Sequence, residues 1–103
     1  MTGRAYQFSP TAKKDLQKII DYTIDNFGIK HAKKYVRSLE KCADNLAQGN
    51  LSRSIPDISP ITTFIKCKHH YIFGFSQKEE PFYVVAIFHE KMDLIQRLKK
   101  RLS

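Results

Sequence analysis

Hydrophobic positions are most concentrated in the stretch Tyr71–His89, where two apolar runs flank a short polar segment. The runs are Tyr71–Phe75 and Phe82–His89. Both are rich in aromatic and β-branched residues, which favour strands. Pro81 precedes the second run, a position at which a strand tolerates proline. The pattern therefore predicts a β-hairpin.

The second of these runs is apolar on both of its sides. Strict alternation would place Phe82, Val84, Ala86 and Phe88 on one face and Tyr83, Val85 and Ile87 on the other. A strand of this kind belongs in the middle of a sheet that is covered on both sides. We therefore expect another layer against each face of the sheet.

The N-terminal part of the chain predicts a short strand followed by a helix. Arg4–Phe8 is the candidate strand. Ser9 then suits the N-cap of a helix and Pro10 its first position, where a missing N–H has no cost. Apolar residues at helical spacing continue to about Asn26, and Gly28 is expected to end the helix.

A second helix is predicted from about Ile29 to the stop signal at Gly49-Asn50. Its apolar positions recur with a period near 3.5 residues: Ala32, Tyr35, Val36, Leu39, Ala43 and Leu46. The connection around Gly28 is short, so the two helices should form an antiparallel hairpin that covers one face of the sheet.

The remaining segments complete an α+β fold in a single domain spanning residues 1–103. Asn50–Pro60 is interpreted as an irregular loop, Thr62–Cys67 as a strand, and Met92–Ser103 as a short basic C-terminal helix. The expected order is β-α-α-β-β-β. An N-terminal strand and a helix hairpin precede a three-stranded antiparallel meander that completes one sheet.

Composition limits the possible partners and the cellular location. The net charge of +8 and the pI near 9.6 favour polyanions such as nucleic acid, a nucleoprotein machine or an acidic protein. No apolar run is long enough to span a bilayer, and the N-terminus lacks the apolar core of a signal peptide. Cys42 and Cys67 lack CxxC spacing and are interpreted as reduced residues of a cytoplasmic protein.

The inventory of reactive side chains favours binding over bond-breaking chemistry. His69 and His70 are adjacent, so on a strand they point to opposite faces and cannot grip the same metal ion. His31 and His89 have no carboxylate or cysteine at ligand spacing. Neither cysteine lies in a recognisable nucleophile motif, and the four glycines form no phosphate-binding loop. We expect no metal and no cofactor.

Basic residues are the more informative candidates. Lys66, Lys68 and His70 share one parity, so a continuous strand would place them on the same face, near His89 at the end of the neighbouring strand. The candidate contacts to a partner or to nucleic acid are Lys66, Lys68, Arg97, Lys99, Lys100 and Arg101. For the C-terminal cations, simple solvation of the surface is the slightly favoured interpretation.

The residues as a set resemble the ParE toxins of the RelE/ParE superfamily. The resemblance begins with Tyr6-Gln7-Phe8-Ser9-Pro10, Ala12, Asp15-Leu16, Ile19, Tyr22-Thr23 and Phe27-Gly28. It continues with Ala32, Tyr35, Leu39, Leu46-Ala47, Phe64 and His70-Tyr71-Ile72-Phe73, and closes with Val84-Val85-Ala86-Ile87-Phe88-His89-Glu90-Lys91-Met92-Asp93. Gly74 is a departure, because the family often has a tyrosine there.

This resemblance implies a toxin of a type II toxin–antitoxin module that inhibits DNA gyrase and blocks replication. It also implies neutralisation by an acidic, ParD-like antitoxin, which we expect to lie over the helix hairpin. The alternative is a RelE-like, ribosome-dependent mRNA endonuclease that would use Lys66, Lys68, His70 and His89. A degenerate member without toxicity is a third reading.

Overall fold

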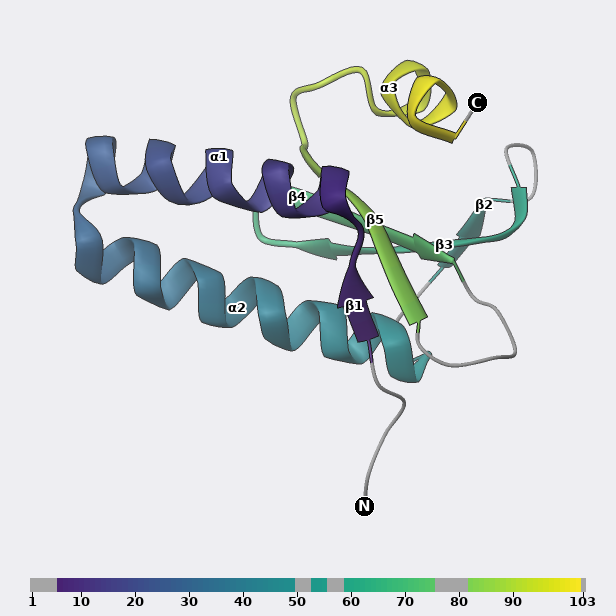
Figure 1. The fold of residues 1–103 in the computed structure, drawn as a ribbon, viewed down its shortest axis with the longest axis horizontal. Coiled ribbons are helices and arrows are strands. Elements are labelled where there is room, and N and C mark those ends of the chain that lie inside the picture. Colours follow the sequence, from purple (N-terminus) through teal and green to yellow (C-terminus); the bar gives the residue numbers. More distant parts are fainter. Residues whose placement is uncertain (1–5, 50–52, 56–58, 76–81, 103) are drawn as a thin grey trace.

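The hairpin predicted at the centre of the chain is present in the computed structural model, which describes residues 6–49, 53–55, 59–75 and 82–102. Its strands are β4 (His70–Phe75) and β5 (Phe82–His89), paired antiparallel. The polar connection between them lies outside the described residues. The expected hairpin is thus confirmed, and it occupies the middle of a five-stranded sheet (Figure 1).

The helix hairpin also forms where the sequence predicts it. Helix α1 (Pro10–Phe27) is capped by Ser9, whose Oγ accepts a hydrogen bond from the N–H of Ala12 at 3.1 Å. Helix α2 (Ile29–Gln48) follows after Gly28 alone, which has a φ of 92° that favours glycine. Gly49 ends α2 in the left-handed conformation.

The sheet has the order β1-β5-β4-β3-β2 and is not wholly antiparallel. Strand β1 (Tyr6–Phe8) runs parallel to β5, whereas β3 (Ser59–Cys67) is antiparallel to β4. The expectation of an irregular loop over Asn50–Pro60 is wrong. A short strand, β2 (Arg53–Ile55), forms within that segment and pairs with β3, which itself begins at Ser59. Backbone pairing with β3 compensates for the weak strand signal of these residues.

The predicted alternation of side chains along β5 is wrong because the strand contains a bulge. Phe73 pairs with Ala86 and Gly74 with Val84, so Val85 is an extra residue in β5. Phe82, Val84 and Ile87 pack in the core beneath the helices, whereas Val85, Ala86 and Phe88 pack in the core on the other face. The bulge moves Ala86 and Phe88 away from the face that strict alternation assigns them.

Both faces of the sheet are covered, as expected for a central strand that is apolar on both sides. The α1–α2 hairpin lies over one face and buries Ala12, Leu39 and Leu46 against it. Helix α3 (Leu94–Leu102) lies over the other face, where Leu98 is completely buried (Figure 1). The predicted C-terminal helix is therefore a structural layer of the fold.

The prediction of two reduced cysteines is wrong. Cys42 of α2 and Cys67 of β3 are joined by a disulfide that spans 25 residues of sequence. The spacing in sequence carried no signal of this pair, because the two residues meet only when α2 packs across the end of β3. The disulfide therefore fixes the helix hairpin to the sheet.

Candidate functional site

The polar side chains with the most perturbed environment gather at one end of the sheet. Three histidines meet there, because β3 and β4 are joined by a tight turn and β5 ends beside it. His69 lies in the turn, and His70 of β4 pairs directly with His89 of β5. The rings of His70 and His89 are 5.1 Å apart between centroids and nearly perpendicular. We call His69, His70, His89, Tyr35 and Glu90 the histidine cluster.

Tyr35 connects the histidine cluster to the helix hairpin. Its hydroxyl lies 2.5 Å from Nδ1 of His70. Burial, with smaller contributions from His89 and His69, lowers the pKa of His70 to about 4, and burial raises the pKa of Tyr35. At neutral pH the phenol is therefore protonated and donates to a neutral imidazole, so the His70 proton resides on Nε2.

Glu90 and its two partners form the exposed side of the cluster. One carboxylate oxygen lies 2.8 Å from Nδ1 of His69 and the other lies 3.2 Å from Nζ of Lys66. Hydrogen bonds from His69 and Lys66 lower the pKa of Glu90. The carboxylate of Glu90 is thus ionised and already hydrogen-bonded to His69 and Lys66. Glu90 therefore suits a structural role better than the role of a general acid.

The structure does not bring together the four residues predicted for ribonuclease chemistry. Lys68 and His69 form the turn, and Lys68 has a φ of 56°, so the strand does not continue to His70. Lys66 pairs with Tyr71, on the face that α3 covers, whereas His70 points toward Tyr35 on the opposite face. The prediction that Lys66, Lys68 and His70 share a face is wrong, although His70 and His89 do meet.

Two functional candidates were not predicted from the sequence. Tyr35 was interpreted only as an apolar helix position, and nothing in the sequence indicates that α2 passes over β4 at His70. Glu90 follows the last strand and meets His69 because the β3–β4 turn folds back, with the N–H of Glu90 donating to the carbonyl of His69 at 2.8 Å. Both contacts depend on tertiary packing.

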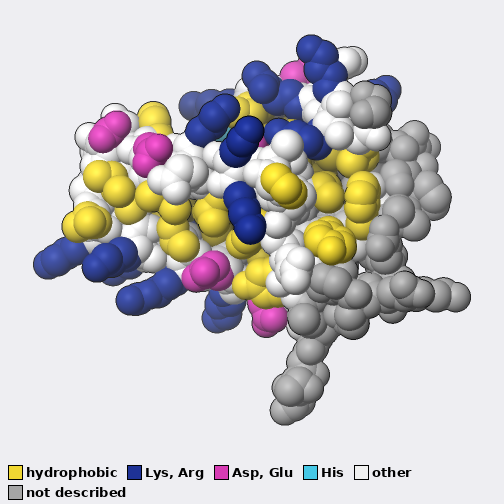
Figure 2. Space-filling model, viewed as in Figure 1, with side chains coloured by type: hydrophobic (Ala, Val, Ile, Leu, Met, Phe, Trp, Pro, Cys, Tyr) yellow, Lys and Arg dark blue, Asp and Glu magenta, His cyan; other side chains and the backbone are white. Residues whose placement is uncertain are grey.

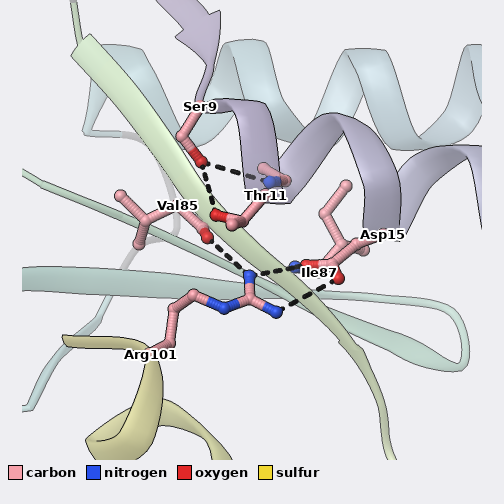
Figure 3. Close-up of polar contacts among 7 residues, drawn as sticks. Ser9, Thr11, Asp15, Val85, Ile87 and Arg101 are labelled. Carbon is pink, nitrogen blue, oxygen red and sulfur yellow. Dashed lines mark hydrogen bonds and ion pairs between the residues drawn. The ribbon is translucent and has the colours of Figure 1, made fainter. Parts of the chain in front are cut away.

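Arg101 has a structural role that the sequence prediction did not assign. Its guanidinium binds both carboxylate oxygens of Asp15 at 3.0 and 3.2 Å and donates to the carbonyl of Val85 at 3.0 Å (Figure 3). Asp15 also accepts a hydrogen bond from the N–H of Ile87 at 3.1 Å. Arg101 is therefore occupied within the fold and is not a free contact for a partner. Among the other predicted contacts, the side chains of Arg97, Lys99 and Lys100 are exposed.

A groove of about 790 Å³ lies beside α3. Its apolar lining includes Phe64, Tyr71 and Phe73 of the sheet together with Leu94 and Ile95 of α3. Two cations, Arg53 and Lys66, also line it. The groove is thus an apolar concavity with positive charge on its wall, and its lining extends from α3 on one face of the sheet to Cys42 and Asn45 of α2 on the other.

The described residues contain no group of three or more histidine, cysteine, aspartate or glutamate side chains arranged to hold a metal ion. Within the same part of the chain, none of the helices combines the length and apolar character needed to cross a membrane.

The fold is shared with a solved toxin–antitoxin structure. A solved structure described as the chromosomal ParDE TA system from P. aeruginosa superposes with a TM-score of 0.66, over 84% of this chain and 95% of that one, at 17% identity. The family of the ParE toxin of the type II toxin–antitoxin system, parDE, matches residues 6–94. The chain therefore belongs to the ParE toxin family.

Two relatives agree with this assignment over nearly their whole length. Toxin ParE of Escherichia coli is 37% identical over 100 residues, which covers 96% of this chain and 97% of the relative. Toxin ParE1 of Mycobacterium tuberculosis is 30% identical over 94 residues, which covers 90% and 96% respectively. The similarity thus includes the helix hairpin and the central strands.

Proposed function

We propose that this chain is the toxin of a type II toxin–antitoxin pair and that it acts by binding DNA gyrase in the cytoplasm. The observation that carries the proposal is the family match over residues 6–94, with relatives named as toxins. In this proposal the toxin holds gyrase on cleaved DNA and so stops replication. It performs no bond-breaking step of its own.

The geometry of the histidine cluster supports a binding mode of action. The candidate general base His70 is neutral and hydrogen-bonded to Tyr35, and Lys66 is directed to the other face of the sheet. The carboxylate of Glu90 is already engaged by Lys66 and His69. A phosphodiester bound at this end of the sheet would not meet an assembled acid, base and cation.

An acidic, ParD-like antitoxin is the proposed partner. The groove beside α3 supports this, because its apolar lining can take side chains of an amphipathic segment while Arg53 attracts carboxylates. The sequence alone led us to expect the antitoxin over the helix hairpin, and that position stays a prediction.

Purified gyrase provides the direct test. The full-length protein at micromolar concentration is expected to inhibit supercoiling and to stabilise the cleaved DNA complex. The double variant R97E/K99E on α3 should weaken inhibition at least about tenfold, since like charges at a contact are strongly unfavourable. The matched control K30E/K41E changes two exposed lysines of α2 and should inhibit as the parent protein does.

No inhibition and no stabilised cleavage complex would contradict the gyrase proposal. Harmless expression of the intact protein without an antitoxin would instead favour a non-toxic member of the family.

A ribosome-dependent mRNA endonuclease is the second candidate, and the Tyr35–His70–His89 arrangement is the observation that favours it. The Nε2–H of His70, held in place by the Tyr35 hydrogen bond to Nδ1, can donate a hydrogen bond that stabilises charge on a phosphate oxygen during RNA cleavage. Codon-phased cleavage of mRNA after induction, lost in His70→Ala but not in Lys68→Ala, would identify this activity. An unchanged mRNA population during growth arrest would exclude it.

A further inference from the structure

The Cys42–Cys67 disulfide lies at the wall of the groove beside α3. Cys42 lines the groove together with Asn45, which follows it on α2. On the side of the sheet, the lining includes Ile65 and Lys66, the two residues that precede Cys67 in β3. The disulfide is therefore part of the junction at which the α2 wall and the β3 wall of the groove meet.

The two sulfur atoms of this bond differ in how they can be approached. Cys42 is half-buried and lines the groove, whereas Cys67 is only 3% exposed and packs in the core beneath the helices. A thiolate that comes from solvent must reach the sulfur atom that it attacks, so access helps to set the rate of thiol–disulfide exchange. An external thiol therefore reaches Cys42, and Cys67 is the leaving group.

Cys67 also has a hydrogen-bond acceptor ready for the thiol that exchange would leave. Its Sγ lies 3.3 Å from the carbonyl oxygen of Ser38, which is one turn before Cys42 on α2. A disulfide sulfur has no proton to donate, whereas a thiol at the same position can donate its S–H to this carbonyl. The Tyr35–His70 hydrogen bond still fastens α2 to the sheet when the disulfide is open. The fold therefore accommodates the reduced sulfur in place.

The lining of the groove suits a small, acidic thiol. Its volume of about 790 Å³ is within the range of roughly 300–1,000 Å³ that is typical of small-molecule sites. Arg53 lines the groove and is exposed, whereas Lys66 already pairs with Glu90 at 3.2 Å. Figure 2 shows Lys and Arg side chains gathered around α3, which adds to the positive field beside the groove. Glutathione, a tripeptide thiol with net negative charge, belongs to the class that this field favours.

We propose that Cys42 is an exchange site at which a small acidic thiol opens the Cys42–Cys67 disulfide from the groove. The incoming thiolate forms a bond to Sγ of Cys42 while the bond between the two half-cystines breaks. Sγ of Cys67 leaves with the electron pair and takes up a proton. A second thiolate then attacks the sulfur of the first and releases Cys42 as a thiolate. Two molecules of the small thiol are thus oxidised to their own disulfide as the protein disulfide is reduced.

Exchange at Cys42 has a consequence for the groove. While the mixed disulfide lasts, the small thiol attached to Cys42 lies in the groove, so it and any other occupant exclude each other. The inference rests on the position of the disulfide alone and does not depend on the gyrase or antitoxin proposals.

Two single-cysteine variants measure which sulfur atom exchanges. Cys67→Ser leaves one thiol at Cys42 and Cys42→Ser leaves one at Cys67, so both full-length variants lack the disulfide and form a matched pair. Each is treated with oxidised glutathione, and mass spectrometry follows the mixed disulfide. The thiol at Cys42 is expected to react at least about tenfold faster, because it lines the groove. In concentrated urea the difference should fall below about threefold, since the fold no longer shields Cys67.

The parent protein provides a second measurement that does not depend on the folding of either variant. A brief exposure to reduced glutathione, followed by alkylation with N-ethylmaleimide, is expected to give chains with glutathione on Cys42 and the alkyl group on Cys67. Peptide mapping by mass spectrometry locates both groups. Glutathione on Cys67, or equal rates in the two folded single-cysteine variants, would overturn the proposal.

The variant Arg53→Glu tests the preference for an acidic thiol. Reduction of the disulfide by glutathione should slow at least about threefold, because the new carboxylate repels the negatively charged thiol. Reduction by neutral 2-mercaptoethanol should keep its rate. Lys30→Glu, in the first turn of α2, changes the net charge equally and should leave both rates as in the parent protein. An equal effect of Arg53→Glu on the two thiols, or no effect on either, would overturn the assignment of an acidic thiol.

Discussion

Asp15 is the residue through which α1, β5 and α3 are held together. Strand β1 pairs with β5 only as far as Val84, so the backbone of β5 beyond the bulge has no neighbouring strand on that side. Asp15 accepts from the N–H of Ile87, and Arg101 donates to the carbonyl of Val85 (Figure 3). Two side chains thus supply the hydrogen bonds that a longer β1 would have made. Arg101 also stacks over the ring of Phe88 at 5.2 Å.

Removing Arg101 should therefore destabilise the protein. Arg101→Met leaves the carboxylate of Asp15, whose side chain is 13% exposed, without its cation. The expected loss is about 3 kcal/mol in the free energy of unfolding, measured by urea denaturation.

The exposed neighbour Arg97 is the matched control, and Arg97→Met should change stability by less than about 0.5 kcal/mol. If the two substitutions had equal effects, the Asp15–Arg101 pair would not have this structural role.

At the level of elements, the sequence predicted the features that neighbouring residues determine, such as the helix ends. The helix ends are marked by residue types that favour caps, namely Ser9, Gly28 and Gly49. Both helices were therefore predicted to within a residue or two. The parallel pairing of β1, the short strand β2 and the bulge at Val85 depend on partners far away in sequence. The same limit applied to the candidate site. Lysines and histidines could be named, but their division between two faces followed from the turn at Lys68.

Gly74 shows how the bulge and the packing depend on each other. A Cβ added at Gly74 would clash with the ring of Phe82 and lie 2.8 Å from the carbonyl oxygen of Tyr83. The space that a side chain at Gly74 would occupy is thus filled by the ring of Phe82. Gly74→Ala should lower the free energy of unfolding by about 1–3 kcal/mol, as overpacking of a core does.

Thermal or urea denaturation measures this loss, and Gly49→Asn serves as its control. Asparagine tolerates the left-handed conformation at Gly49, and no atom lies within 4 Å of a Cβ placed there. A Gly74→Ala protein as stable as the parent would show that the strand pair adjusts without cost.

On the scale of the whole molecule, the disulfide connects the two layers that also meet at the histidine cluster. Cys42–Cys67 and the Tyr35–His70 hydrogen bond both fasten α2 to the end of the sheet. The separation of 25 residues is large enough for the link to restrict the unfolded chain.

The double variant Cys42→Ser/Cys67→Ser should therefore have a free energy of unfolding that is lower by about 3 kcal/mol, as the chain-entropy estimate gives. Urea denaturation with and without dithiothreitol measures the difference, and the reductant should have no effect on the double variant. Two thiols that react with Ellman's reagent in the unreduced, denatured protein would contradict the assignment of the disulfide.

The parallel pairing of β1 with β5 has a consequence for biosynthesis. Tyr6 is registered with Phe82, so the first strand has no neighbour until most of the polypeptide has emerged from the ribosome. The sheet is completed late in synthesis or after it, when β5 pairs with β1 on one side and with β4 on the other. A nascent or truncated chain that lacks β5 consequently cannot complete the sheet. A cell that produces such fragments therefore contains no folded toxin from them.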